Sequence, residues 1–204
     1  TIRKITPGGV VTTVAGLSGS TGSSDGTGSA ARFNYPMAVA VDAGGNIYVT
    51  DGLNHAIRKV APGGAVTTLA GGTFGTADGT GSEAHFMFET GAALGAGGVA
   101  VDANGNVFVT AFETVRKITP GGVVTTLAGG FGGTATVDGT GSAAQFSAEL
   151  GFLVVDGAGN LIVADDDACR IRMVTQAGVV TTVAGLPIRH SGMDGTGNAA
   201  EFPG

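Results

Sequence analysis

Short apolar runs rich in β-branched residues, broken by glycine-rich turns, recur along the whole chain. In the most regular stretch, residues 38–42 and 47–51 flank a Gly/Asn turn, and residues 57–60 and 65–70 flank Pro-Gly-Gly. Runs of this length, bounded by turn residues, predict strands joined as hairpins. The pattern therefore predicts four antiparallel strands in a meander.

The sequence of one of these hairpins occurs four times along the chain. It reads TIRKITPGGVVTTVAG from Thr1, AIRKVAPGGAVTTLAG from Ala56, TVRKITPGGVVTTLAG from Thr114 and RIRMVTQAGVVTTVAG from Arg170. A fixed period of this size, about 55 to 58 residues here, indicates units that cannot bury their apolar faces alone and must pack on their neighbours. Repeated meanders of four strands are typical of β-propeller blades.

A second element recurs between the meanders. It reads DGTGSAARF at 25–33, DGTGSEAHF at 78–86, DGTGSAAQF at 138–146 and DGTGNAAEF at 194–202. We expect the Asp-Gly pair to form a turn and the Ser or Asn to cap a single helical turn. The phenylalanine that closes each insert is expected to plug this turn onto the core: Phe33, Phe86, Phe146 and Phe202.

The run VAVDAGGNIYVTDGLNHAIRKVAPGGAVTTLAG, residues 39–71, resembles the NHL-repeat family of β-propellers. The glycine-rich inserts are similar to those of bacterial secreted or surface proteins of that family, and the likeness covers essentially the whole chain. The resemblance implies an all-β propeller fold with one short helical turn between blades. It leaves function open, because such folds serve enzymes, binding modules and scaffolds alike.

We expect one continuous array over residues 1–204, with a half blade at 1–16 and full blades at 39–71, 99–129 and 153–185. Because closed propellers need about four to eight blades, the resulting three and a half do not close. Three explanations stay open. The chain is a window of a longer protein, it assembles with copies of itself, or it is an open monomer with exposed strand edges.

Composition narrows the classes of partner. The chain has 39 glycines among 204 residues, which fits many tight turns, and its net charge of −6 disfavours nucleic acid or an anionic membrane. No apolar run approaches the roughly 18 residues of a membrane span. Cys169 is the single cysteine, which excludes a disulfide framework and a thiolate metal site.

Two sets of charged residues recur at fixed places and are expected to be structural. The arginines at the same strand position of every unit are expected to pair with an acidic residue of a neighbouring strand, such as Asp51 or Asp165. An Asp before each Gly/Asn turn can accept backbone N–H bonds and fix the hairpin. The two sets are Arg3, Arg58, Arg116 and Arg172, and Asp42, Asp102 and Asp156.

No metal or cofactor is expected. The insert carboxylates Asp25, Asp78, Asp138 and Asp194 each offer too few oxygens for Ca²⁺, which leaves turn formation as the favoured role. The weak calcium candidates are Asp165, Asp166 and Asp167 in one acidic loop. The histidines His55, His85 and His190 fall at three different places in the unit, which argues against a zinc or iron site.

The favoured function is a noncatalytic scaffold or protein-binding module, extracellular or at the cell surface, that binds other protein chains, including copies of itself. Head-to-tail contact would give a ring or a filament. The expected assembly contacts are Ile2, Ile5, Val11, Val14 and Phe202. The alternative is an enzyme: propellers of this kind resemble lactonases and amidating lyases with a metal at the channel mouth, which residues 87–98 and 165–167 would have to supply.

Overall fold

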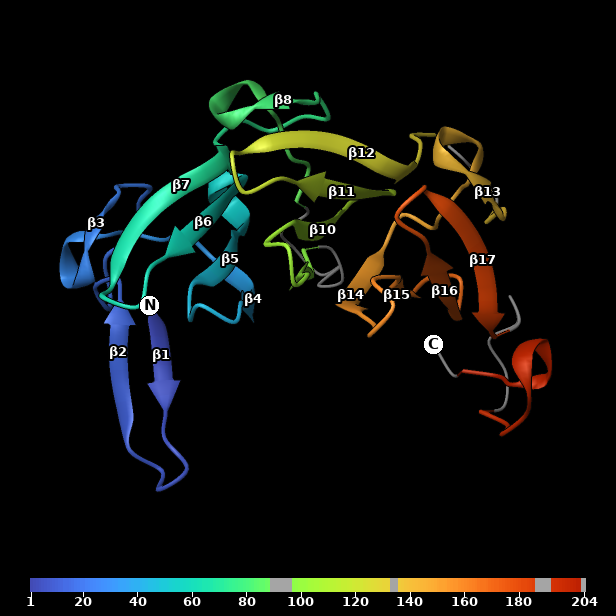
Figure 1. The fold of residues 1–204 in the computed structure, drawn as a ribbon, viewed down its shortest axis with the longest axis horizontal. Coiled ribbons are helices and arrows are strands. Elements are labelled where there is room, and N and C mark those ends of the chain that lie inside the picture. Colours follow the sequence, from blue (N-terminus) through green and yellow to red (C-terminus); the bar gives the residue numbers. More distant parts are fainter. Residues whose placement is uncertain (89–96, 133–135, 186–191, 203–204) are drawn as a thin grey trace.

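In the computed structural model, which describes residues 1–88, 97–132, 136–185 and 192–202, the chain forms an all-β array. A two-stranded hairpin and three five-stranded sheets follow one another around an arc (Figure 1). The hairpin lies at one end of the arc and the last insert at the other. The predicted β-propeller fold class is confirmed, as a partial propeller.

The first hairpin consists of β1 (Ile2–Ile5) and β2 (Val11–Ala15). Blade 1 consists of β3 (Gly26–Thr27), β4 (Pro36–Val41), β5 (Ile47–Asp51), β6 (Ala56–Val60) and β7 (Ala65–Gly71). Blade 2 consists of β8 (Gly79–Thr80), β9 (Val99–Val101), β10 (Val107–Ala111), β11 (Thr114–Ile118) and β12 (Val123–Gly129). Blade 3 consists of β13 (Gly139–Thr140), β14 (Leu150–Val155), β15 (Leu161–Asp165), β16 (Arg170–Val174) and β17 (Val179–Ala184).

Each blade is the predicted meander with one addition. Four long strands pair antiparallel in chain order, and the outermost ones, β7, β12 and β17, lie along the outer rim (Figure 1). The Gly-Thr of each preceding insert forms a fifth, two-residue strand on that outer strand, as in the pairs Gly26–Val66 and Thr27–Ala65. The expected Asp-Gly turn is therefore wrong, because this segment is extended and fastened to the blade.

Each insert contains a single 3-10 turn, as predicted. These turns are η1 (Gly28–Ala30), η3 (Gly81–Glu83), η4 (Gly141–Ala143) and η5 (Gly197–Ala199), and η2 (Gly52–Asn54) lies within blade 1. The predicted Ser cap is wrong: Thr27 occupies the N-cap of η1 without a side-chain bond, and Ser29 lies inside the turn. The N–H of Gly28 instead donates to the carbonyl of Gly64, 2.9 Å away, in the hairpin turn of blade 1.

Each third strand carries an irregularity in register beside its arginine. In blade 1, Ile57 pairs with Ala70 but Arg58 pairs with Thr68, so one residue of the outer strand is unopposed. Bulges of this kind increase local twist and re-aim side chains. The same shift occurs before Arg3, Arg116 and Arg172.

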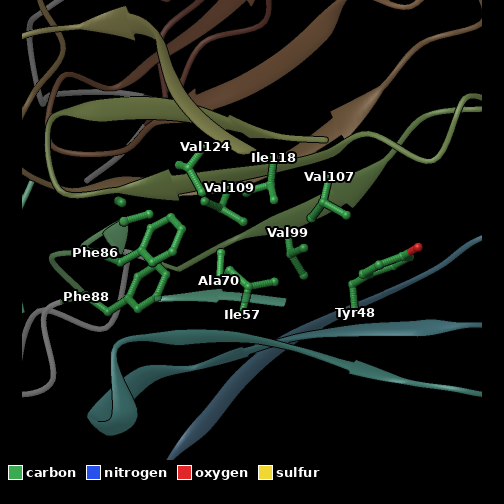
Figure 2. Packing of buried hydrophobic residues seen from close by; sticks show 12 residues of the cluster. Tyr48, Ile57, Ala70, Phe86, Phe88, Val99, Val107, Val109, Ile118 and Val124 are labelled. Carbon is green, nitrogen blue, oxygen red and sulfur yellow. The ribbon is translucent and has the colours of Figure 1, made fainter. Parts of the chain in front are cut away.

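The core lies between blades, as expected when no unit can bury its apolar face alone. Phe86 and Phe88 stack with ring centroids 5.4 Å apart. In Figure 2 the two rings lie between Ile57 and Ala70 of blade 1 and Val109 and Val124 of blade 2. Equivalent clusters around Phe33 and Phe146 join the first hairpin to blade 1 and blade 2 to blade 3.

A glycine at the end of each outer strand admits the insert phenylalanine. Gly129 has φ of 94°, and a Cβ there would lie 3.0 Å from Phe146 Cδ2 and overlap the Glu113 carbonyl oxygen. Only glycine tolerates both the left-handed backbone and this approach. The Ala-Gly pair that ends each repeated hairpin therefore packs against the phenylalanine ring of the next insert.

Within the described ranges, none of the helices has the length and apolar character needed to cross a membrane.

Candidate functional site: the joint between blades

A buried arginine sits at the centre of each internal joint. Arg58 of β6 is fully buried, and its guanidinium donates to Asp51 Oδ2 at 2.8 Å and to Asp25 Oδ1 at 2.7 Å. Asp51 belongs to the same blade and Asp25 to the insert that precedes it. A buried arginine requires carboxylates and carbonyls as partners, and here they bind both terminal nitrogens of Arg58. The insert therefore supplies part of the charge that allows this burial.

The insert is held by two further contacts. Asp25 also accepts the backbone N–H of Thr68 at 3.2 Å and its hydroxyl at 3.0 Å. Phe33, eight residues on, lies beneath the Arg58 guanidinium, 5.2 Å from carbon to ring centroid. Arginine over an aromatic face is attractive beyond simple burial. One arginine thus holds both ends of the insert. We call this arrangement of strand arginine, insert Asp, outer-strand Thr and insert Phe the clamp.

The same clamp recurs at the next two joints. We call the three joints 1, 2 and 3, in chain order. In joint 2 Arg116 binds Asp78 at 2.7 Å above Phe86, and in joint 3 Arg172 binds Asp138 at 2.9 Å above Phe146. The hydroxyls of Thr126 and Thr182 bond to these carboxylates. The clamp is therefore a repeated part and not an isolated ion pair.

The joints differ in their second carboxylate. Arg172 binds Asp165 at 2.6 Å, as Arg58 binds Asp51, but the corresponding residue in blade 2 is Ala111. Burial lowers the pKa of Arg116, against the opposing effect of Asp78. Burial raises the pKa of Asp51, although hydrogen bonds from Asn54, Asn34 and Arg58 act in the opposite direction. Joint 2 thus has one half-exposed carboxylate for its arginine.

The pKa of Asp138 is shifted in the opposite direction to that of Asp51. Burial acts to raise the pKa of this carboxyl, but the hydrogen bonds from Thr182 and Arg172 and the nearby guanidinium charge bring it below the ordinary value. Asp138 is therefore held in its charged form by the blade to which its insert is fastened.

Arg3 and the fourth insert carry the same residues without the contacts. Arg3 is exposed, and within the described residues it has no ion pair. Asp194 is exposed as well and is likewise unpaired in that part of the chain. Phe202 is 37% exposed, whereas Phe33, Phe86 and Phe146 are 5% or less. The described residues therefore form three complete clamps and two halves without a partner.

The hairpin carboxylates lie in the turns between the first two long strands of each blade. Asp42 Oδ1 accepts the Asn46 N–H at 2.8 Å, and its other oxygen accepts the Asn46 amide at 2.8 Å and the Tyr48 hydroxyl at 3.1 Å. Asp102 and Asp156 accept the same two bonds from Asn106 and Asn160. Each of these carboxylates closes a turn.

Tyr48 gives this turn a measurable titration. Burial, with the hydrogen bond and negative charge of Asp42, raises the pKa of Tyr48 from 10.0 to about 12. The stabilisation is fully present below pH 10 and is lost as the pH rises through about 12, because the folded state holds the proton more tightly. In the Tyr35→Phe variant, ultraviolet absorbance of the tyrosinate should titrate near pH 12. Adding Asp42→Asn should lower that midpoint. A midpoint near 10 in the Tyr35→Phe variant with Asp42 intact would contradict the raised pKa of Tyr48.

The acidic loop is only partly available to a ligand. Asp165 Oδ1 accepts the N–H and hydroxyl of Ser147, and its Oδ2 is bound by Arg172. Asp166 and Asp167 are exposed. In the described ranges no group of three His, Cys, Asp or Glu side chains is placed to hold a metal ion. His190 and residues 89–96 of the divergent segment 87–98 lie outside those ranges.

The sequence pointed to the arginines and to Asp51 and Asp165, but it missed the insert carboxylates as their second partners. The available signal was that DGTG and the strand arginine occur once each in every unit. That signal alone does not identify the partners, because they lie far apart in sequence: Arg58 and Asp25 are separated by 33 residues.

The family model of the NHL repeat matches residues 33–60. No curated protein matches the sequence. Among solved structures, an auxiliary nutrient binding protein from Bacteroides ovatus is 18% identical with a TM-score of 0.57, over 98% of this chain and 48% of that one. A second such protein, from Bacteroides thetaiotaomicron, is 16% identical with a TM-score of 0.55, over 81% of this chain and 40% of that one.

Virginiamycin B lyase from Staphylococcus aureus, in a catalytically inactive form with quinupristin, is 12% identical with a TM-score of 0.53, over 89% of this chain and 47% of that one. The chain thus spans about half the length of these proteins, and the likeness concerns the fold. Residues 33–60 thus match the NHL repeat and the blades have propeller architecture, which supports the predicted resemblance to NHL-repeat β-propellers.

Proposed function

We propose that the chain is a noncatalytic protein-binding scaffold, extracellular or at the cell surface, that assembles head to tail with copies of itself. The observation that carries the proposal is a pair of exposed apolar faces whose equivalent positions are buried or half-buried at the internal joints. One face belongs to the first hairpin and the other to blade 3 with its following insert.

The first face consists of Ile5 and Val11. They are 69% and 42% exposed. The register places them where blade 1 has Val60 and Val66, which are 0% and 2% exposed because they pack on the first hairpin and Phe33. Ile2 and Val14 point the other way, into that intramolecular core, and do not belong to the proposed contact.

The second face consists of Ile171, Met173, Val183 and Phe202. Val183 is 45% exposed and Ile171 and Met173 are half-buried. Ile171 takes the place of Ile57 and Val115, which are fully buried at joints 2 and 3. This face is therefore equivalent to the side of each blade that receives the next unit.

Because the two faces are unlike, contact between copies has a direction. A contact of this type repeats at every copy, which produces a ring if the rotation closes and a filament if it does not. Apolar area removed from water, at about 25 cal/mol per Å², supplies the driving force, as it does at the internal joints. The two nutrient-binding neighbours are consistent with a binding role for such propellers.

The proposal predicts a concentration-dependent increase in particle size. In sedimentation velocity the 19.8 kDa chain should form species of several copies, and Ile5→Asp or Val183→Asp should return it to single chains, because a buried charge without a partner is costly. Val123→Asp is the matched control, since Val123 is 43% exposed on the outer rim of blade 2. A wild-type chain that sediments as a monomer at high concentration would refute self-assembly.

A further inference from the structure

The fourth insert, residues 194–202, packs on blade 3 and is already folded, although among the described residues no following blade is fastened to it. The Glu201 N–H donates to the Met193 carbonyl at 2.9 Å, as the N–H of Arg32 donates to Ser24 in the first insert. Gly197 has φ of 57°, against 56°, 59° and 57° in the other three inserts. The insert therefore needs no rearrangement to act as the inserts of joints 1 to 3 do.

The groups through which the other inserts bind a blade have no such partner in the fourth insert, within the described residues. Gly195 and Thr196 are not in a strand, whereas the Gly-Thr of every other insert pairs with an outer strand. Asp194 and Phe202 have neither the arginine nor the threonine that hold their counterparts, as far as the described residues extend. This half of a clamp has a polar group, an aromatic ring and an extended segment ready for a partner.

The first hairpin carries the other half. Arg3 pairs in register with Thr13, as Arg58 pairs with Thr68, and in both cases just after a bulge. Gly9 stands in the hairpin turn at the place of Gly64, whose carbonyl accepts the N–H of the insert glycine Gly28. The strand edge and the arginine are exposed on the same side as Ile5 and Val11.

We propose that the fourth insert of one copy is bound by the first hairpin of the next copy, which completes an intermolecular clamp like those within the chain. Arg3 and Thr13 bind Asp194, Phe202 lies beneath the Arg3 guanidinium, and Gly195–Thr196 adds as a short strand to β2. This inference rests on the proposed head-to-tail assembly and names the contact that directs it. The partner is a second copy of this chain.

The clamp determines the orientation in which two copies join as well as the strength of their contact. A charge-assisted bond between guanidinium and carboxylate is strong when buried and selects its complement. Two first hairpins brought together would place Arg3 against Arg3, and two fourth inserts would place Asp194 against Asp194. Both arrangements leave like charges unpaired, which disfavours them. The contact therefore favours hairpin-to-insert order.

Two variants each disable one half of the clamp. Arg3→Glu leaves the insert intact but gives a hairpin that repels Asp194, and Asp194→Ala leaves the hairpin intact but removes the insert carboxylate. Each alone should self-associate at least about tenfold more weakly, a loss of about 1.4 kcal/mol. Mixed in equal amounts, they should form a one-to-one dimer that grows no further, because the pair contains a single intact clamp.

Lys4→Glu and Asp166→Lys are the matched controls, since both side chains are exposed and neither lies in the clamp. Native mass spectrometry distinguishes the outcomes, with circular dichroism to check that each variant is folded. If Arg3→Glu and Asp194→Ala each assembled as strongly as the wild type, the clamp would be overturned, and assembly through the apolar faces would remain. A wild type that never assembles would refute the proposed function itself.

Discussion

Replacing Arg58 with leucine should lower the free energy of unfolding by about 3–5 kcal/mol, since it leaves a buried carboxylate without its counter-charge. Asp51 is fully buried, and Arg58 is its cationic partner in the described structure. The chain contains no tryptophan, so urea unfolding is best followed by circular dichroism.

Arg116→Leu is the matched comparison. It removes the same side chain from the same strand position, but Ala111 stands where blade 1 has Asp51, and Asp78 is 48% exposed and can be hydrated. The loss should therefore be clearly smaller than for Arg58→Leu. Equal losses for the two variants would show that the buried carboxylate is not the cause.

Phe146→Ala should lower the free energy of unfolding by about 3–5 kcal/mol, because it empties a ring-sized space at the centre of joint 3. Phe146 is 1% exposed and packs between blades 2 and 3. Since repeat arrays depend on the contacts between neighbours, this loss also uncouples two blades. Thermal unfolding should become broader as well as shifting to lower temperature.

Phe202→Ala is the control for this prediction. In the single chain its ring is 37% exposed, so truncation should change thermal stability little in dilute solution. If both variants lost stability equally, the insert ring would be stabilising its own turn rather than the joint.

Local pattern was enough to predict the strands and the turns between them. The Pro-Gly-Gly hairpins, the short apolar runs and the period of the repeat all depend on residues close in sequence, and the four-stranded meanders are present as expected. The pairing of Arg58 with Asp51 also spans few residues, since the two lie on adjacent strands seven residues apart.

What the sequence left open depends on contacts between units. The fifth strand of each blade and the bond from Asp25 to Arg58 arise because the insert of one unit lies along the outer strand of the next. Glycine is depleted in strands and two residues are too few to form one alone, so the extended form of Gly-Thr depends on pairing with Val66 and Ala65. The local sequence therefore predicts a turn, which is the structure that Asp-Gly usually forms.

The exposure of Arg3 and Phe202 could not be predicted from the repeat either. Their residue types and positions match those of Arg58 and Phe33, and only the neighbours around them differ. Identical sequence signals thus gave buried and exposed side chains, because burial in an array is decided by the adjacent unit.

Each joint contains its own acid for its own arginine. Tandem duplication or loss of a whole unit in the gene would therefore add or remove a buried arginine together with its carboxylate, without leaving an unpaired ion in the interior. Arrays of this kind can change length over evolutionary time by unequal recombination, and each added module arrives with the means to attach itself.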